Sequence, residues 1–429
     1  MSGSTTERRA WAIEIIRALR AAGHTAYLAG GCVRDELLGL NPKDFDIATD
    51  ATPDRVHVLF PRSELVGAAF GVVIVKGRLG MIEVATFRAD GHYADRRRPD
   101  SVTFSDAVTD AQRRDFTVNA LFLDPLAPAD PALTASLGIV PQGLVIDLVH
   151  GIPDLAAKVL RAVGDPDKRF AEDDLRVLRA VRFATRFGLA IEQATESAIR
   201  HHAGQLAGIS RERVGDEMRR MLGSPSRLAA IALIEHLDLA RPVLAAACIG
   251  SWSQHIPALN ALPIDAPPML TTAAWLLDRG LDPDYRTIHP DPTAALRDSW
   301  MLSNDEISDL RSSLTSLHTL ETKWGGMGEA QRKRSAASAG FAWAKHLLRG
   351  RHPPLNTQIS GEVAQLAARH GGLAPSPFIT GDDLIRHGLR PGPRFKAILD
   401  QTYDAQLEGR VGDQSAALSF ALALAQSNP

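Results

Sequence analysis

The segment Asp44-Phe45-Asp46-Ile47 alternates acidic and apolar residues, and this alternation constrains the fold more than any other feature of the chain. Side chains two positions apart on a strand share one face, so Asp44 and Asp46 project together while Phe45 and Ile47 enter a core. The strand is therefore expected to carry a core on one side only. Two carboxylates on its other face, with little nearby to neutralise them, indicate a cation-binding site.

Helical and strand patterns alternate in the N-terminal third of the chain. Residues 7–22 have apolar positions at helical spacing, and Thr52-Pro53-Asp54 is a start signal for a short helix. Strand character is found at residues 26–28, 44–47, 72–76 and 81–87. We predict an α+β head, a mixed sheet with flanking helices, followed by an all-α neck, body and tail. The expected divisions are residues 1–154 for the head, 155–224 for the neck, 225–330 for the body and 331–429 for the tail.

Composition narrows the class of protein. The 429 residues carry a formal net charge of −2, which excludes binding of a polyanion through overall charge, so any nucleic-acid surface must come from local clusters of arginine. Cys32 and Cys248 lie too far apart in the sequence to suggest a disulfide framework. No apolar run reaches the length of a membrane span, and residues 1–9 lack the hydrophobic stretch of a secretion signal. We expect a cytoplasmic protein without a membrane partner.

Two glycines, Gly30 and Gly31, follow the first predicted strand and precede a helical pattern. Glycines at such a turn let backbone N–H groups approach a triphosphate, and Arg34 can add charge-assisted hydrogen bonds. The two nearby carboxylates offer the hard oxygen ligands that Mg²⁺ prefers. Each motif alone is more often ordinary surface or turn, but together they supply the parts for metal-assisted phosphoryl transfer.

Further motifs follow these two in a fixed order. They are EVATFR at residues 83–88, DGHYADRRRP at 90–99 and RRDFTVNAL at 113–121. On these motifs the sequence resembles the class II tRNA nucleotidyltransferases and the bacterial poly(A) polymerases of the polymerase-β superfamily. The resemblance extends over roughly residues 26–222.

By this resemblance, Asp44 and Asp46 are the catalytic residues and hold two Mg²⁺ ions, which activate the RNA 3′-hydroxyl and steady the leaving pyrophosphate. Glu83 is either a third carboxylate near the metals or a surface residue at a strand end. The arginines at 96–98 are either an element that reshapes the pocket or solvated surface. Nucleotide-binding roles are implied for Gly30, Gly31, Arg34, Arg114, Asp115 and Asn119. For the last two, a structural capping role fits equally well.

The predicted neck carries the expected basis for choosing a nucleotide. Cytosine and adenine each present an amino donor beside a ring-nitrogen acceptor, so a carboxylate with a guanidinium accepts them and rejects uracil and guanine. The class II enzymes have a Glu-Asp-x-x-Arg motif that acts as an amino-acid template, and Glu172, Asp173 and Arg176 match it. Arg179 and Arg182 would line the same nucleotide pocket. The alternative interpretation is an exposed helix face with ion pairs one turn apart.

The resemblance implies template-independent addition of CCA to the 3′ acceptor end of tRNA from CTP and ATP, with Mg²⁺ as cofactor and no obligate protein partner. A poly(A) polymerase would share every catalytic residue, although the near-neutral charge of this chain is less typical of one. Partial enzymes that add only CC or only A stay open, as does a non-catalytic tRNA-binding module of the same fold.

The sequence departs from the pattern of the family in two places. His150 stands where relatives carry the first glycine of an Asp-x-x-Gly-Gly motif, which brings the geometry of that turn into question. The Ala/Pro-rich stretch at 125–141 is longer than the usual link and has no assigned role. Beyond about residue 225 the resemblance fades, and the helical tail is expected to hold tRNA by shape and phosphate contacts. Core packing is favoured over stacking on RNA for Trp252, Trp275, Trp300, Trp324 and Trp343.

Overall fold

The computed structural model describes residues 4–66, 70–91, 100–129, 131, 133, 137–138, 142–369, 371–390 and 392–427. The chain divides into two compact units, Met1–Glu217 with Ala232–Val243, and Met218–Ile231 with Leu244–Pro429. Every predicted site residue belongs to the first unit. The arginines at 96–98 and part of the 125–141 stretch lie outside the described residues. The finer division into four parts stays a prediction.

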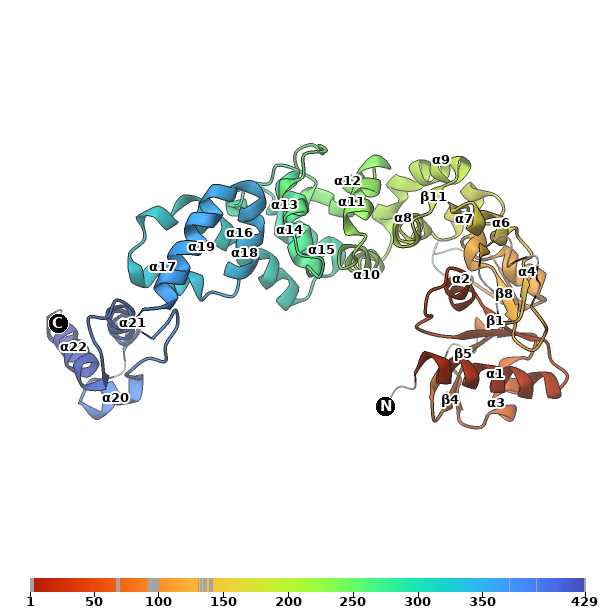
Figure 1. The fold of residues 1–429 in the computed structure, drawn as a ribbon, viewed down its shortest axis with the longest axis horizontal. Coiled ribbons are helices and arrows are strands. Elements are labelled where there is room, and N and C mark those ends of the chain that lie inside the picture. The colour runs from red at the N-terminus through yellow and green to blue at the C-terminus, as the bar shows by residue number, and fades with distance from the viewer. Residues whose placement is uncertain are drawn as a thin grey trace. The chain divides into compact units, whose positions relative to one another are not determined.

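The first unit is built around a seven-stranded sheet with the strand order β3-β4-β5-β2-β1-β8-β9 (Figure 1). Its strands are β1 (Ala26–Ala29), β2 (Asp46–Thr49), β3 (Ser63–Glu64), β4 (Val72–Gly77), β5 (Gly80–Thr86), β8 (Phe122–Asp124) and β9 (Leu144–Ile146). Neighbouring strands are antiparallel except for β2 and β5, which run parallel. A separate two-stranded sheet pairs β6 (Arg88–Asp90) with β7 (Val102–Phe104). The predicted mixed sheet is confirmed, although the strand expected at 44–47 begins at Asp46.

Helices α1 (Thr5–Ala21) and α3 (Pro53–Leu59) lie beside strands β4 and β5 (Figure 1). Ser4 caps α1 in a reciprocal capping box with Glu7, and Thr52 caps α3. Each large apolar side chain that such a helix buries contributes about 1.5–3 kcal/mol to folding. The large aliphatic residues that α1 buries fully are Ile15, Ile16 and Leu19.

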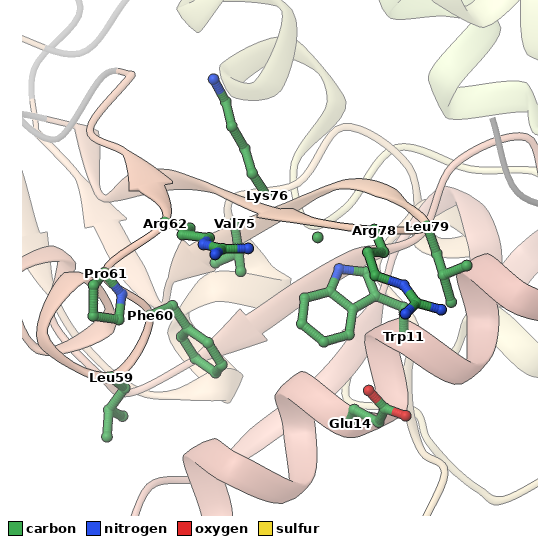
Figure 2. A pocket seen from close by; sticks show the side chains of 11 residues that line it. Trp11, Glu14, Leu59, Phe60, Pro61, Arg62, Val75, Lys76, Arg78 and Leu79 are labelled. Atoms are coloured by element: carbon green, nitrogen blue, oxygen red, sulfur yellow. The ribbon is translucent and has the colours of Figure 1, made fainter. Parts of the chain in front are cut away.

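A cavity of about 620 Å³ opens where α1 meets the end of α3 and the β4–β5 turn (Figure 2). Trp11, Phe60 and Val75 form part of its wall. Gly77 lies so close to the indole that an added Cβ would come within 2.5 Å of the Trp11 ring. Side chains alternate between faces along a strand, whereas directly paired residues share a face. Ile74 pairs with Glu83, which pairs with Asp46, so Val75 and the cavity that it lines lie on the opposite face of the sheet from Asp46.

The rest of the first unit is mainly helical. Its helices include α2 (Gly31–Leu37), α4 (Ala107–Gln112), the short η2 (Thr117–Asn119), α6 (Gly151–Ala156), α7 (Pro166–Glu172), α8 (Arg176–Phe187), α9 (Gln193–His202) and the start of α10 (Arg211–Leu222). A parallel pair of short strands, β10 (Val159–Leu160) and β11 (Ala190–Ile191), corrects the prediction of an all-α neck. Each strand has only two residues, too few for a period-two pattern to show in the sequence. The predicted apolar arc of α8 is buried at Val177, Leu178, Val181 and Ala184.

The regular elements of the second unit, among its described residues, are all helices. Its helices are α13 (Pro257–Asn260), α14 (Pro268–Asp278), α15 (Pro292–Trp300), α16 (Asn304–Thr322), α17 (Glu329–Ala336), α18 (Phe341–Arg351), α19 (Pro353–Ala367), α20 (Gly381–Arg386), α21 (Pro393–Leu407) and α22 (Gln414–Ser427). Helices α11 (Arg227–His236) and α12 (Ala240–Leu244) cross the division between the units. Core positions are confirmed for Trp275, Trp300 and Trp324. Among the described residues, no helix combines the length and the apolar character that crossing a membrane requires.

The turn that contains His150 keeps its shape without the expected glycine. His150 adopts the left-handed conformation, with φ 63° and ψ 35°, which glycine tolerates best and which histidine visits more often than most residues. The Asp147 carboxylate accepts hydrogen bonds from the backbone N–H groups of Val149, Gly151 and Ile152. Gly151 is indispensable, because an added Cβ would lie 2.3 Å from a backbone oxygen of η2.

We predict that His150→Gly raises the free energy of unfolding by about 0.5–1 kcal/mol, because it removes left-handed strain from a non-glycine residue. Urea denaturation followed by circular dichroism measures the change. The control is His57→Gly in the last turn of α3, where glycine should lower stability by about 1 kcal/mol. A loss of stability in both variants would show that the turn does not strain His150.

Candidate active site

Three carboxylates gather where β2 begins beside β5. Asp46 is the first residue of β2 and lies in register with Glu83 on the parallel strand β5. Directly paired residues on adjacent strands share one face, about 4.8 Å apart along the sheet. Asp44 lies two residues before Asp46 with a side chain that is 85% exposed, and Arg8 Nη1 of α1 lies 3.7 Å from its Oδ1 atom.

The electrostatics of this group favour a bound cation. Desolvation, followed by the negative charges of Glu83 and Asp44, raises the pKa of Asp46 to about 6, although Arg114 acts in the opposite direction. Desolvation also raises the pKa of Glu83, against the effect of Arg88. A divalent cation offsets the repulsion between neighbouring ionised carboxylates. Because all the donor atoms are oxygens, the group suits a hard ion. The residues present therefore fit a metal of that kind.

The glycine turn lies beside these carboxylates. Gly30 has a φ of 69° and precedes α2, and an added Cβ would come within 2.8 Å of Arg114 Nη1. The absence of a side chain at Gly30 leaves room for the guanidinium of Arg114. Nη1 of this group donates to the backbone oxygen of Asn119, and Nε and Nη2 both donate to Oδ2 of Asp110. Glycine at position 30 thus serves both the turn conformation and the placement of an arginine beside the three carboxylates.

Arg34 is held inside the protein. It is almost fully buried, and its guanidinium donates to Asn119 Oδ1 and to the carboxylate of Asp35. Desolvation lowers the pKa of Arg34, while Asp35 opposes that effect. The guanidinium carbon also lies 4.2 Å from the centroid of the Phe187 ring, within range of a cation–π contact.

Asp115 joins the sheet region to helix α8. Its Oδ2 accepts two hydrogen bonds from Arg179, at 2.9 and 2.6 Å, and its Oδ1 accepts from Asn119 Nδ2 at 3.1 Å. Burial alone would raise the pKa of Asp115, but the charge and hydrogen bonds of Arg179 outweigh it and hold the pKa at about 2. In the structure Asp115 and Asn119 connect these motifs. Neither caps η2, which has Phe116 at its N-cap and no side-chain hydrogen bond there, and the nucleotide-binding role of the two residues stays a prediction.

The Glu-Asp-x-x-Arg motif forms different pairs from those expected. Arg176 is 9% exposed and donates to Glu172 Oε2 at 2.5 Å and to the backbone oxygen of Arg169 at 2.7 Å. Asp173 instead accepts from Arg213 Nη2 of α10 at 2.7 Å, and from the backbone N–H of residue 175. The structure brings the motif residues together at the start of α8, but it does not pair Asp173 with Arg176.

Arginines and aromatic rings alternate along α8. The guanidinium carbons of Arg179 and Arg182 lie 5.2 and 4.3 Å from the Phe183 ring centroid, and Arg182 Nε donates to Glu217 Oε2 at 2.5 Å. Sequence reasoning missed Phe183 and Phe187, whose i,i+4 spacing on one helix was the available signal. It also missed Glu217 as the partner of Arg182, and no local pattern marks that pair.

Comparison with known proteins places this geometry in a class. The protein-family model described as "Poly A polymerase head domain" matches residues 26–161. A second family model, described as "Probable RNA and SrmB- binding site of polymerase A", matches residues 188–247. The sheet with its carboxylates thus lies in the head of a nucleotidyltransferase. A CCA-adding enzyme of Lactiplantibacillus plantarum is 34% identical over 424 residues, covering 96% of each chain. The chain belongs to the family of the CCA-adding enzymes and related poly(A) polymerases.

Other relatives agree over nearly the whole length. A CCA-adding enzyme of Lacticaseibacillus paracasei is 33% identical over 94% of this chain and 93% of its own. Among solved structures, the Bacillus stearothermophilus CCA-adding enzyme in complex with CTP has a TM-score of 0.73 and 27% identity, covering 97% of each chain. The Thermotoga maritima CCA-adding enzyme complexed with tRNA has the same fold, with a TM-score of 0.65, 20% identity, and coverage of 96% of this chain and 94% of its own.

We predict that Asp115→Asn lowers the free energy of unfolding by about 2 kcal/mol at pH 7. The reason is that Arg179, which is partly buried, loses the carboxylate of Asp115 as its partner. A carboxylate with a depressed folded-state pKa stabilises above its unfolded pKa of 3.8, and this stabilisation is lost as pH falls through about 2. The difference between wild type and variant, measured by urea denaturation, should therefore shrink below pH 4. An undiminished difference at pH 2.5 would contradict this assignment.

Proposed function

We propose that this protein adds the CCA sequence to the 3′ end of tRNA, using CTP and ATP and releasing pyrophosphate. The observation that carries the proposal is the gathering of Asp44, Asp46 and Glu83 where β2 begins beside β5, in a chain of this family. A chain 34% identical over 96% of the length of a CCA-adding enzyme supports the same activity. We place the reaction in the cytoplasm, in keeping with two free cysteines at Cys32 and Cys248.

Asp44, Asp46 and Glu83 are the residues that would hold Mg²⁺. The ions, when bound, lower the pKa of the RNA 3′-hydroxyl and stabilise charge on the leaving pyrophosphate. Arg114 presents its guanidinium beside the carboxylates and is the first candidate to contact the triphosphate, with Gly30 and Gly31 giving it close access. Arg34 is buried and donates to the side chain of Asn119, whose backbone oxygen accepts from Arg114. Arg34 would therefore help to orient Arg114.

The amino-acid template is proposed at the start of α8. Asp173 would accept a hydrogen bond from the exocyclic amino group of cytosine or adenine, and Arg176 would donate to the adjacent ring nitrogen. In the structure these groups bind Arg213 and Glu172 instead, so a neutral incoming base has to take the place of charged partners. Arg179 and Arg182, stacked on Phe183, complete the proposed pocket.

A poly(A) polymerase is the nearest alternative, because the head model carries that description. The named relatives and the net charge of −2 favour CCA addition over it. Partial enzymes that add only CC or only A share the same motifs. A non-catalytic tRNA-binding module would have no reason to keep the crowded carboxylates, whose repulsion costs stability.

One assay separates these functions. The full-length protein is incubated with Mg²⁺, a tRNA transcript lacking its last three nucleotides, and each labelled nucleoside triphosphate alone or combined. We expect two C residues from CTP alone, and a completed product of three added nucleotides with CTP and ATP. A long A tract, or an end after CC or after a single A, identifies the other enzymes. No incorporation with any triphosphate would leave only the binding module.

Variants separate chemistry from selection. Asp44→Ala should reduce incorporation of every nucleotide by about a thousandfold or more, because it removes a proposed metal ligand without disturbing a core. Asp173→Ala should keep incorporation measurable and raise the use of UTP relative to CTP about tenfold, since a lost hydrogen bond releases about 1–3 kcal/mol of discrimination. The control is Asp54→Ala in the first turn of α3. Full rejection of UTP by the Asp173 variant would refute the template.

The raised pKa of Asp46, about 6, predicts competition between protons and Mg²⁺. The metal binds the ionised carboxylate, so its apparent dissociation constant should increase about tenfold between pH 7 and pH 5. Calorimetric titration with MgCl₂ in the absence of nucleotide measures this change. Glu83→Gln removes the second cause of the shift and should move the pH dependence to lower pH. A dissociation constant for Mg²⁺ that does not change between pH 7 and pH 5 would show that Asp46 does not gain a proton in this range.

A further inference from the structure

A second group of metal-ligating side chains lies between α7 and α9, apart from the catalytic carboxylates. Asp167 is near the start of α7, and His201 and His202 are the last residues of α9. Asp167 Oδ1 lies 2.9 Å from His201 Nδ1 and 3.4 Å from His202 Nε2. One ligand atom from each of the three residues lies within 4.8 Å of the other two.

His202 is held in the orientation that a metal ligand needs. Its Nδ1 lies 3.2 Å from Oδ1 of Asp174, a carboxylate that is 2% exposed. A carboxylate accepts a proton but cannot donate one when ionised, so this contact places the hydrogen on Nδ1 and leaves the Nε2 lone pair directed at Asp167. A buried carboxylate that fixes the far nitrogen of a histidine is the usual outer support of a histidine bound to zinc.

The distances also match tetrahedral coordination. With bonds of about 2.0–2.1 Å to nitrogen and oxygen, neighbouring ligand atoms around tetrahedral Zn²⁺ are about 3.3 Å apart. The distances from Asp167 Oδ1 to His201 Nδ1 and to His202 Nε2, 2.9 and 3.4 Å, lie on either side of this value. The side chains of His201 and Asp167 are 76% and 57% exposed, so an ion can enter and keep a water molecule as fourth ligand.

We propose that Asp167, His201 and His202 bind a divalent transition metal of the zinc type, with Asp174 as the positioning residue for His202. Two imidazoles and one carboxylate select such ions over Mg²⁺, which prefers oxygen ligands. The site joins α7 to α9, and its supporting residue Asp174 follows Asp173 in the chain. Its role is therefore structural, to hold the start of α7 against the end of α9. The proposal does not rest on the proposed catalytic function.

The test uses the full-length protein, stripped with a chelator and kept in excess Mg²⁺ so that the catalytic carboxylates are occupied. Zn²⁺ should bind at one equivalent and raise the thermal unfolding midpoint, and Co²⁺ should give visible absorption typical of tetrahedral nitrogen and oxygen ligands. His201→Ala, which removes an exposed side chain, should weaken Zn²⁺ binding more than tenfold and abolish the thermal shift. The matched control is His57→Ala on α3, which should leave both unchanged.

A second variant tests the supporting role. Asp174→Asn should weaken Zn²⁺ affinity 10–100-fold while the three ligands remain. An Asp44→Ala variant should bind Zn²⁺ as the wild type does, because the two sites are independent. The proposal is overturned if His201→Ala binds one equivalent with unchanged affinity, if Asp44→Ala removes the binding, or if the wild type shows no binding at micromolar Zn²⁺.

Discussion

Repulsion among carboxylates at the start of β2 is the constraint around which the first unit is organised. Parallel pairing of β2 with β5 puts Asp46 and Glu83 side by side, and no rearrangement of side chains alone can separate two residues that share a register. The sheet is held by apolar burial on its other face, through Ile47, Val73 and Val84. Burial of that kind sustains an unfavourable charge cluster until a cation relieves it.

A second layer of charge lies between this sheet and α8. Asp115 and Arg179 form a hydrogen-bonded ion pair between residues 64 positions apart in the sequence. Buried ion pairs contribute little net stability but are costly to break, so they fix geometry more than they stabilise a fold. Through Asn119, which bonds to both Asp115 and Arg34, the sequence motifs of the head and of α8 become parts of one connected network.

Local patterns were sufficient for part of this architecture. The Asp44 and Asp46 pair, the capped helix at Thr52 and the apolar arc of α8 all follow from spacings of two to four residues, and the sequence predicts each of them. The mixed sheet followed by helices was predicted for the same reason. Strand β8 and the β10–β11 pair escaped prediction because they have only two or three residues, and their pairing depends on distant partners.

The pairs that complete the candidate site could not be read from spacing. Arg176 follows both Glu172 and Asp173 within one turn, so sequence alone offers two carboxylates at almost equal separation. The structure selects Glu172, because Asp173 is taken by Arg213 from a helix 40 residues away. Likewise nothing in the sequence near Arg182 points to Glu217. Long-range packing decides such choices, and it depends on how helices meet rather than on the composition of either helix.

In the link between α7 and α8, two neighbouring aspartates bind different partners. Asp173 has extended backbone angles, φ −152° and ψ 98°, so Asp173 and Asp174 point to opposite sides. Asp173 binds Arg213 and Asp174 binds His202, which restrains the link from both directions. When a base takes the place of Arg213, the hydrogen bond from the backbone N–H of residue 175 still holds the Asp173 carboxylate, so it cannot shift to suit a base of the wrong donor pattern. Rigidity here is therefore the physical condition for the selectivity that the proposed function requires.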